Sequence, residues 1–242
     1  MKKVFVLVQV IGLTILMSCK SGGPGSNGGS ADQPYGEKSG IVTYKPMDMM
    51  GVKVTQTMYF DEYGKKETRE TMVEGNMMGM EMRQHTVDIR DGNIIYHYEL
   101  ENFSGGQDRA TKNAYKSTLT AEMFEQMNIE ALSDKFKAKL DYKDEGKETV
   151  AGIEGVKYSI APDSINRSNR ITGVHYKNIP LKVTMGQMEI VADKADFKAT
   201  VPAEKFKVPE GYTIMDQPTE QMPQLPADAP AEAPMEADPH SK

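Results

Sequence analysis

The chain has 242 residues, with 29 lysines and arginines against 35 aspartates and glutamates and a net charge of −6. This acidic balance argues against a nucleic-acid partner, because phosphate binding needs a basic field. The single cysteine, Cys19, excludes an intramolecular disulfide and any metal site built on cysteines.

The first residues are typical of an export signal. Lys2 and Lys3 precede an apolar run over residues 4–16, which is shorter than the roughly 20 residues that span a membrane. The run ends in Leu-Met-Ser-Cys at residues 16–19, which resembles a lipobox, the motif where a lipid is attached to the cysteine and the signal is cut just before it. We therefore predict a signal peptide over residues 1–18 and a lipid on Cys19. An ordinary signal with a chance cysteine is the alternative.

Lipidation of Cys19 would make the membrane itself a partner of the protein, since two or three acyl chains anchor a protein firmly. Lys20 follows Cys19, where the common signal for retention in the inner membrane has an aspartate. No acidic cluster follows either, which argues against export to the cell surface. We expect an outer-membrane lipoprotein that faces the periplasm.

Two polar segments flank the predicted folded domain. Residues 19–38 are rich in glycine and serine and cannot bury much apolar surface, which predicts a flexible tether behind the lipid. Residues 216–242 hold six of the 13 prolines and a net charge of −5, which predicts a disordered tail of proline, alanine and acidic residues. This tail is either a solvated spacer or a contact for an envelope protein. The folded domain is expected over residues 39–215.

The first half of this domain has the alternating pattern of half-buried strands. Residues 52–60 predict a strand, and Asp-Glu-Tyr-Gly at 61–64 predicts a tight turn. Residues 66–73 predict a polar strand at a sheet edge or facing solvent. Two further strands are expected over 80–90 and 94–100. One face of the first strand carries Val52, Val54, Gln56, Met58 and Phe60.

The period changes after Thr120, which is suited to cap a helix. One or two short helices are predicted over 121–138, and strand signals return from 148 to 197. The pattern predicts the α+β class, with a strongly curved antiparallel sheet, or half-open β-barrel, covered by one or more short helices. The apolar helical face carries Met123, Phe124, Met127, Leu132 and Phe136.

Motifs in both halves resemble the LolA/LolB-like proteins of the lipoprotein-carrier superfamily. In the second half they are Gly-Lys-Glu-Thr-Val-Ala-Gly-Ile-Glu-Gly-Val-Lys-Tyr (146–158), Tyr-Lys-Asn-Ile-Pro-Leu-Lys (176–182) and Phe-Lys-Val-Pro-Glu-Gly-Tyr (206–212). In the first half, Met-Met-Gly (49–51) and Tyr-Phe-Asp-Glu-Tyr-Gly-Lys-Lys (59–66) resemble a family of such lipoproteins common in Bacteroidota. The resemblance covers residues 39–214. It implies a half-open antiparallel barrel closed by helices, with an apolar cavity that can hold acyl chains.

Seven of the 18 methionines form two local clusters, at residues 47–50 and 77–82. Methionine is flexible and polarizable, so these residues fit a core or rim, an adaptable lining for a lipid, or a Cu(I) site. The Cu(I) site would use Met77, Met78, Met80, Met82 and His85. The residues that we select to line a ligand cavity are Val54, Met58, Phe60, Met80, Met82, Ile95, Met123, Phe124 and Met127.

The sequence carries no nucleophile elbow, HExxH motif, phosphate loop or dinucleotide fingerprint. Its carboxylates fall in predicted turns and on exposed faces, so no acid–base pair stands out. We therefore expect a protein that is not an enzyme, has no cofactor and binds a lipid or acyl chain. The alternatives are a protein-interaction module that uses the acidic tail, and a methionine-rich Cu(I)-binding protein.

Overall fold

The computed structural model describes residues 33–49, 51–77, 79–120, 134–161 and 170–217. In this part of the chain, the strands form one sheet in the order β14-β8-β6-β5-β4-β3-β1-β13-β12-β11-β10-β9, with β2 beside β3 and β7 beside β6. Neighbouring strands are antiparallel except for β14 and β8, which run parallel. None of the described residues belongs to a helix that is long and apolar enough to span a bilayer.

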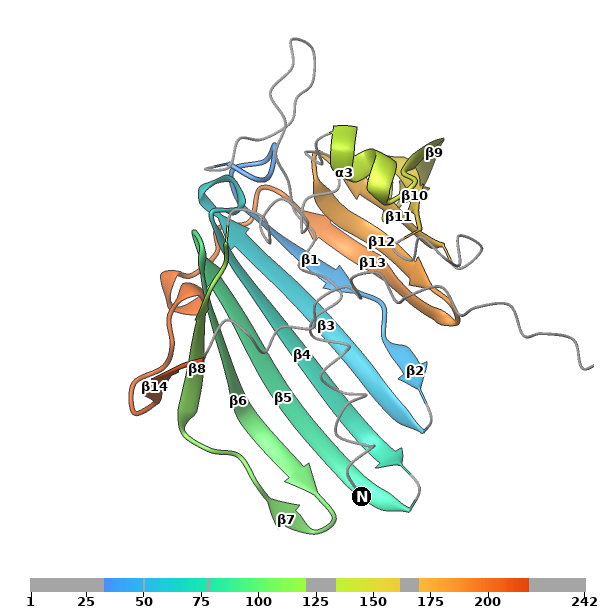
Figure 1. Ribbon diagram of the computed structural model, residues 1–242. Helices are drawn as coiled ribbons and strands as arrows, with labels where there is room; N and C mark the ends of the chain where they lie inside the picture. Colours follow the sequence, from blue (N-terminus) through green and yellow to red (C-terminus); the bar gives the residue numbers. More distant parts are fainter. Residues whose placement is uncertain (1–32, 50, 78, 121–133, 162–169, 218–242) are drawn as a thin grey trace, which may run out of the picture.

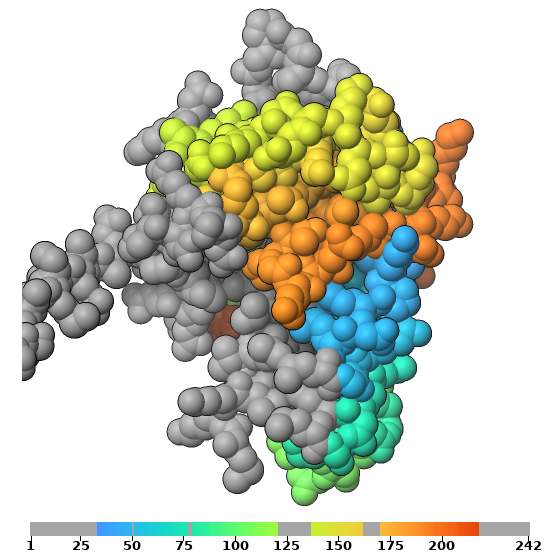
Figure 2. Space-filling model, turned by 90° about the vertical axis from the view of Figure 1, so that its right-hand side faces the viewer, coloured from blue at the N-terminus to red at the C-terminus, as the bar shows by residue number. Residues whose placement is uncertain are grey.

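The first half contains β1 (Gly40–Tyr44), β2 (Met47–Met49), β3 (Val52–Asp61), η1 (Glu62–Gly64), β4 (Lys66–Met77), β5 (Met80–Asp91), β6 (Ile94–Ser104), β7 (Gln107–Asp108) and β8 (Asn113–Thr118). The second half contains α3 (Asp134–Lys139), β9 (Lys143–Val150), β10 (Ile153–Ile160), β11 (Ile171–Tyr176), β12 (Ile179–Met185), β13 (Met188–Asp196), η2 (Ala203–Phe206) and β14 (Thr213–Asp216). The two halves join where β1 pairs with β13, and Figure 2 shows their blue and orange surfaces side by side.

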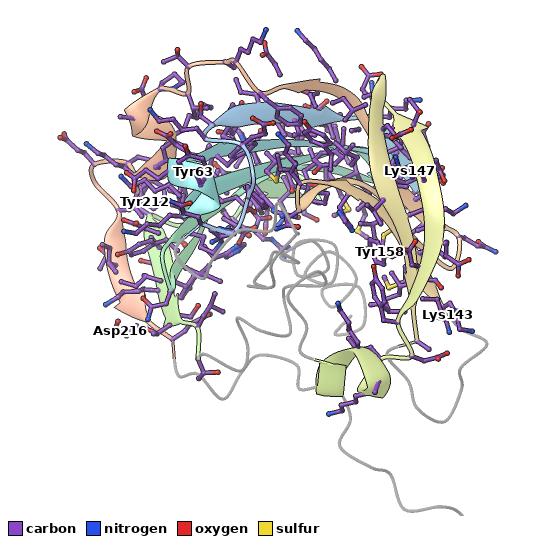
Figure 3. The ribbon with its side chains drawn as sticks, turned by 90° about the horizontal axis from the view of Figure 1, so that it is seen from above. Tyr63, Lys143, Lys147, Tyr158, Tyr212 and Asp216 are labelled. Atoms are coloured by element: carbon purple, nitrogen blue, oxygen red, sulfur yellow. The ribbon has the colours of Figure 1, made fainter. Side chains whose placement is uncertain are left out.

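The sheet is strongly curved and does not close on itself (Figure 1). Seen from above, it forms a wall shaped like the letter C, and Tyr158 of β10 points toward the inside (Figure 3). This is the half-open barrel implied by the resemblance to LolA/LolB-like proteins. Of the helices predicted to cover it, the structure describes only α3, and residues 121–133 lie outside the described part.

A core cluster identifies which side chains point to the concave face. Met58 of β3 and Val150 of β9 belong to one cluster of buried side chains. Five strands lie between β3 and β9 in the sheet, so their side chains can meet only on the inside of its curve. The alternating residues of β3 that share the face of Met58 therefore point inward.

The C-terminal segment covers part of the convex face. Val208 and Tyr212 pack against the outward side chains of β5, β6 and β8. The Tyr212 hydroxyl donates a hydrogen bond to the Glu99 carbonyl at 2.8 Å. β14 then pairs with β8, and Figure 3 shows the segment that carries Tyr212 and Asp216 running along the outside of the sheet. The ordered domain thus reaches slightly beyond residue 215.

The structure confirms the predicted β3 and its turn, but it corrects the strand that follows. Val52 to Phe60 alternate between buried and partly exposed positions as expected. The strand expected at an edge or facing solvent is β4, which instead lies between β3 and β5 in the sheet. Its polar side chains Glu67, Arg69 and Thr71 are buried. The polar composition of β4 therefore reflects a buried interaction rather than exposure to water.

Residues 34–38 pack against the domain, although the sequence assigns them to the flexible tether. Tyr35 is only 1% exposed, and its backbone N–H donates to the Tyr63 carbonyl at 2.8 Å. The Gly36 N–H donates to the Lys177 carbonyl at 3.0 Å. The segment thus bridges the turn after β3 and the turn between β11 and β12, which belong to different halves of the sheet. We call residues 34–38 the N-terminal strap.

The contact between Tyr35 of the strap and Gly64 can be tested by measuring protein stability. A methyl group added at Gly64 would lie 2.3 Å from the Tyr35 ring, whereas one added at Gly92 meets nothing within 4 Å. Both glycines have a positive φ, so both substitutions by alanine carry backbone strain. We expect Gly64→Ala to lower the free energy of unfolding by at least about 1 kcal/mol more than Gly92→Ala does. Urea unfolding measures both, and equal losses would contradict the packing of Tyr35.

Candidate functional site

A buried charged cluster lies on the concave face of β4 and β5. The Glu67 carboxylate accepts hydrogen bonds from Arg69 Nε at 2.5 Å and from Arg90 Nη2 at 2.8 Å. The Tyr35 hydroxyl donates to the same carboxylate. All four side chains are at most 3% exposed. Strand register brings them together, because Glu67 lies opposite Arg90 and two residues from Arg69 along β4.

The two arginines determine the protonation of this cluster. Burial alone would raise the pKa of Glu67, but the charges of Arg69 and Arg90 outweigh it and lower that pKa to about 2. Burial lowers the pKa of Arg69, but the negative charge of Glu67 outweighs it and holds that pKa above its usual value. Burial and the charge of Glu67 both raise the pKa of Tyr35. Glu67 and Arg69 are therefore charged near neutral pH, and Tyr35 is neutral.

Two side chains in the middle of the concave face have polar atoms without partners. Nη1 and Nη2 of Arg69 are buried and bond to nothing in the part of the chain that the structure describes. On β3, Gln56 Nε2 donates to Thr71 Oγ1 at 3.2 Å, while Gln56 Oε1 has no partner among the described residues. A buried polar atom without a hydrogen bond generally costs about 1–3 kcal/mol. Such atoms are uncommon in proteins and mark this region as a candidate site.

An apolar cluster, which we call the methionine patch, adjoins this polar region. Its buried centre is formed by three valines, and four partly buried methionines pack around them. These residues come from β2, β3, β4, β5 and β13, so both local methionine clusters of the sequence contribute. The patch consists of Val52, Val54, Val73, Met47, Met49, Met82 and Met188.

The register of β3 and β4 sets the order of these features along the concave face. Arg69 lies opposite Met58, and the next pair on this face is Gln56 with Thr71. The pair after that is Val54 with Val73, at the methionine patch. Val73 is four residues beyond Arg69, or about 13 Å along an extended strand. The face thus changes from charged through polar to apolar within one short stretch.

The register places all six predicted lining residues from the strands on the concave face. Met58 and Phe60 are fully buried in the core cluster, so they support this face from within and are not exposed on it. Met80 is 44% exposed at the beginning of β5. The other three are Val54, Met82 and Ile95. Cys19 and three predicted lining residues lie outside the described part of the chain: Met123, Phe124 and Met127.

The structure corrects the alternative metal site at one residue. His85 lies opposite Met72 in the β4–β5 register, on the convex face, whereas Met82 lies on the concave face. His85 therefore cannot share a site with Met82. Met78 and the side chain of Met77 lie outside the described part. Among the residues that the structure describes, no group of three or more His, Cys, Asp or Glu side chains could hold a metal ion.

The sequence interpretation missed the charged cluster. It placed the carboxylates in turns and on exposed faces, but Glu67 is buried. A signal was present in the alternation, because Glu67, Arg69 and Thr71 share one face with the apolar Val73. Two opposite charges two residues apart on a strand can pair on the same face. That spacing indicates a buried ion pair only once β4 is known to be central.

No family of known sequences and no curated protein matches the chain. Among solved structures, it is similar to the complex of MucA and MucB from Pseudomonas aeruginosa, with 14% identity and a TM-score of 0.42 over 73% of this chain and 56% of that one. A structure of MucB in complex with MucA(peri) has 15% sequence identity and a TM-score of 0.37, over 72% of this chain and 56% of that chain. LprF from Mycobacterium bovis has 11% sequence identity and a TM-score of 0.30, over 69% of this chain and 89% of the LprF chain. The chain thus spans little more than half the length of the first two, and the similarity concerns the fold alone.

The pKa of Glu67 predicts a dependence of stability on pH. Its value in the folded protein, about 2, lies below the ordinary value of 4.5, so ionised Glu67 contributes stability that is complete above pH 4.5 and is lost as the pH falls toward 2. We expect the free energy of unfolding to fall more steeply over this range in the wild type than in Glu67→Gln. Urea unfolding at a series of pH values measures both slopes.

Glu70→Gln is the matched control for this experiment. Glu70 is a carboxylate on the convex face of the same strand, where Lys205 lies at 2.6 Å. It should keep the steep slope of the wild type. Parallel slopes for the wild type and Glu67→Gln would show that Glu67 is not the group that titrates.

Proposed function

We propose that the protein is an outer-membrane lipoprotein, anchored through Cys19 and facing the periplasm, that binds a lipid or acyl chain on the concave face of its half-barrel. The methionine patch is the observation that supports this proposal most directly. Its four methionines pack against the valines but are only partly buried. Unbranched, polarizable methionine side chains can repack around apolar chains of different shape.

The energetics of apolar burial fit a lipid cargo. Removing a methylene group from water contributes about 0.8 kcal/mol, so a chain that covers the patch gains affinity with every carbon buried. Met82 of β5 and Met188 of β13 both pack against the same cluster of buried valines. An acyl chain in this position would touch several strands at once.

The charged cluster fits a protein that binds its ligand without changing it chemically. Glu67 is held by two arginines and a tyrosine, and the lowered pKa of its carboxyl group keeps it ionised. General acid or base catalysis works best with a pKa near the working pH. Glu67 is therefore poorly suited to donate or accept a proton near neutral pH.

One observation favours the alternative of a protein-interaction module. Ile214 and Met215 on β14 are 54% and 44% exposed, directly before the acidic tail. A pull-down from envelope extract, with and without residues 218–242, separates the two functions. Specific partners that are lost on deletion, from a protein that retains no lipid, would favour the alternative.

Native mass spectrometry of the full-length protein, extracted from its own envelope, tests the proposed function. The denatured sample gives the mass of the covalent lipid, so any additional native mass is cargo. We expect the wild type to carry such a mass. Met82→Glu combined with Met188→Glu places charges in the methionine patch and should lower the retained fraction at least about tenfold, because a buried charge without a partner is costly.

Met72→Glu is the control, because Met72 lies on the convex face and is 39% exposed. This variant should retain cargo as the wild type does. A wild type without cargo, or an equal loss in the control, would contradict binding at the methionine patch.

A further inference from the structure

Arg69 does not have the carboxylate of Glu67 to itself. Arg69 and Arg90 share the single carboxylate of Glu67. Asp88 lies opposite Arg69 in the β4–β5 register, but it pairs with His97, whose Nδ1 lies 2.7 Å from its Oδ1. No ion pair joins Asp88 to Arg69 in the part of the chain that the structure describes. The guanidinium of Arg69 is thus buried with only part of its charge matched.

The unpartnered atoms of Arg69 have a defined geometry. Nε is bonded to Glu67, so the donors that remain are the two Nη groups at the end of the planar guanidinium. Two parallel N–H donors of this kind match two oxygens of a carboxylate or phosphate. Glu67 fixes the orientation of the guanidinium through Nε, and Gln56 Oε1 offers an acceptor on the neighbouring strand. The site therefore presents donors for an anion and one acceptor for a hydroxyl or amide group.

Arg69 lies between the packed core and the methionine patch, so a polar head at Arg69 has an apolar surface for its chain on one side only. On one side, Met58 and Phe60 are fully buried in the core cluster. On the other side, the concave face continues through Gln56 and Thr71 to the methionine patch. An anionic head at Arg69 would leave its apolar chain over the valines and methionines. The head would then lie inside the half-barrel, with the chain directed toward the Met82 end.

We propose that Arg69 binds the anionic head of an amphiphile, a carboxylate or a phosphate, whose apolar chain lies on the methionine patch. This inference rests on the proposed function and narrows its cargo from any hydrophobic molecule to an anionic one. Glu67 acts as a positioning residue for Arg69. Gln56 accepts a hydrogen bond from the same head group where the head carries a donor.

The test measures the affinity of the delipidated full-length protein for three probes below their micelle-forming concentrations. Palmitate, palmitoyl lysophosphatidate and hexadecanol carry chains of the same length but a carboxylate, a phosphate and a neutral head. We expect at least one anionic probe to bind about tenfold or more tightly than hexadecanol, because charged hydrogen bonds are the strong ones. The anionic probe whose affinity depends on Arg69 identifies the head group.

Two variants examine the site in different ways. Arg69→Gln removes the fork and should abolish the preference for the anion, but it also takes a partner from buried Glu67 and can impair folding. Gln56→Glu leaves the cluster intact and places a carboxylate on the strand beside Arg69, within reach of a long side chain. It should therefore compete with the anionic head for Arg69 and lower the affinity for the anionic probe about tenfold more than the affinity for hexadecanol. Thr55→Glu adds the same charge on the convex face and should bind like the wild type.

The outcomes separate this inference from the proposed function. Loss of the preference in Gln56→Glu, with Thr55→Glu unaffected, supports the head site. Equal affinities of the wild type for all three probes, or a preference that survives in Gln56→Glu, would overturn it and leave lipid binding in place. Failure of all three probes to bind the wild type would overturn the proposed function itself.

Discussion

The architecture depends on Glu67, a single buried carboxylate held by two arginines and a tyrosine. Its partners come from β4, from β5 and from the N-terminal strap, so one side chain joins the centre of the sheet to the segment that leads toward Cys19. Removing one member of such a buried cluster leaves a charge without a partner, which typically costs 3–5 kcal/mol. The cluster therefore fixes the register of β4 and the seat of Tyr35 together.

This constraint explains how the concave face is divided. Near the strap, Tyr35 lies edge-on to Phe60 with ring centroids 5.0 Å apart, and its hydroxyl lies 3.9 Å from the Met58 sulfur. That end of the concave face is a packed core. Beyond Arg69, the side chains are smaller or more flexible, and the methionines are only partly buried. An unclosed sheet with one end packed and the other adaptable can hold a molecule without a second domain. In the proposed function, the binding surface is the part of the concave face where the methionines are only partly buried.

Much of the fold could be predicted from the sequence, because alternating residues predict a strand such as β3 and glycines predict the turns between strands. The central position of β4 could not be predicted. Alternation separates the two faces of a strand, but it does not show which face is buried when the buried residues are charged. Glu67 and Arg69 look like solvent-facing residues until β3 and β5 are placed on both sides. Tyr35 was missed for a related reason: it lies among glycine, serine and proline, and only its long-range contacts order the segment.

Part of the candidate site could also be predicted from the sequence, and part could not. The apolar residues of the methionine patch follow from strand periodicity, but their meeting depends on curvature, which brings Met188 of β13 to the valines of β3 and β4. The exclusion of His85 from a methionine site also follows from alternation, once its register with Met72 is known. The unpartnered atoms of Arg69 and Gln56 have no sequence signal at all, because they are defined by what does not contact them in the described structure.

We infer that an amphiphile lies on the concave face with its chain at the methionine patch. Photo-crosslinking of the full-length protein with a palmitate analogue that carries a photoreactive group near the end of its chain tests this directly. Neighbouring residues of β4 point to opposite faces, which makes mass-spectrometric mapping decisive. We expect crosslinks at Val73 and Met82, and none at Met72. Crosslinks at Met72 or elsewhere on the convex face, with Val73 and Met82 unlabelled, would contradict it.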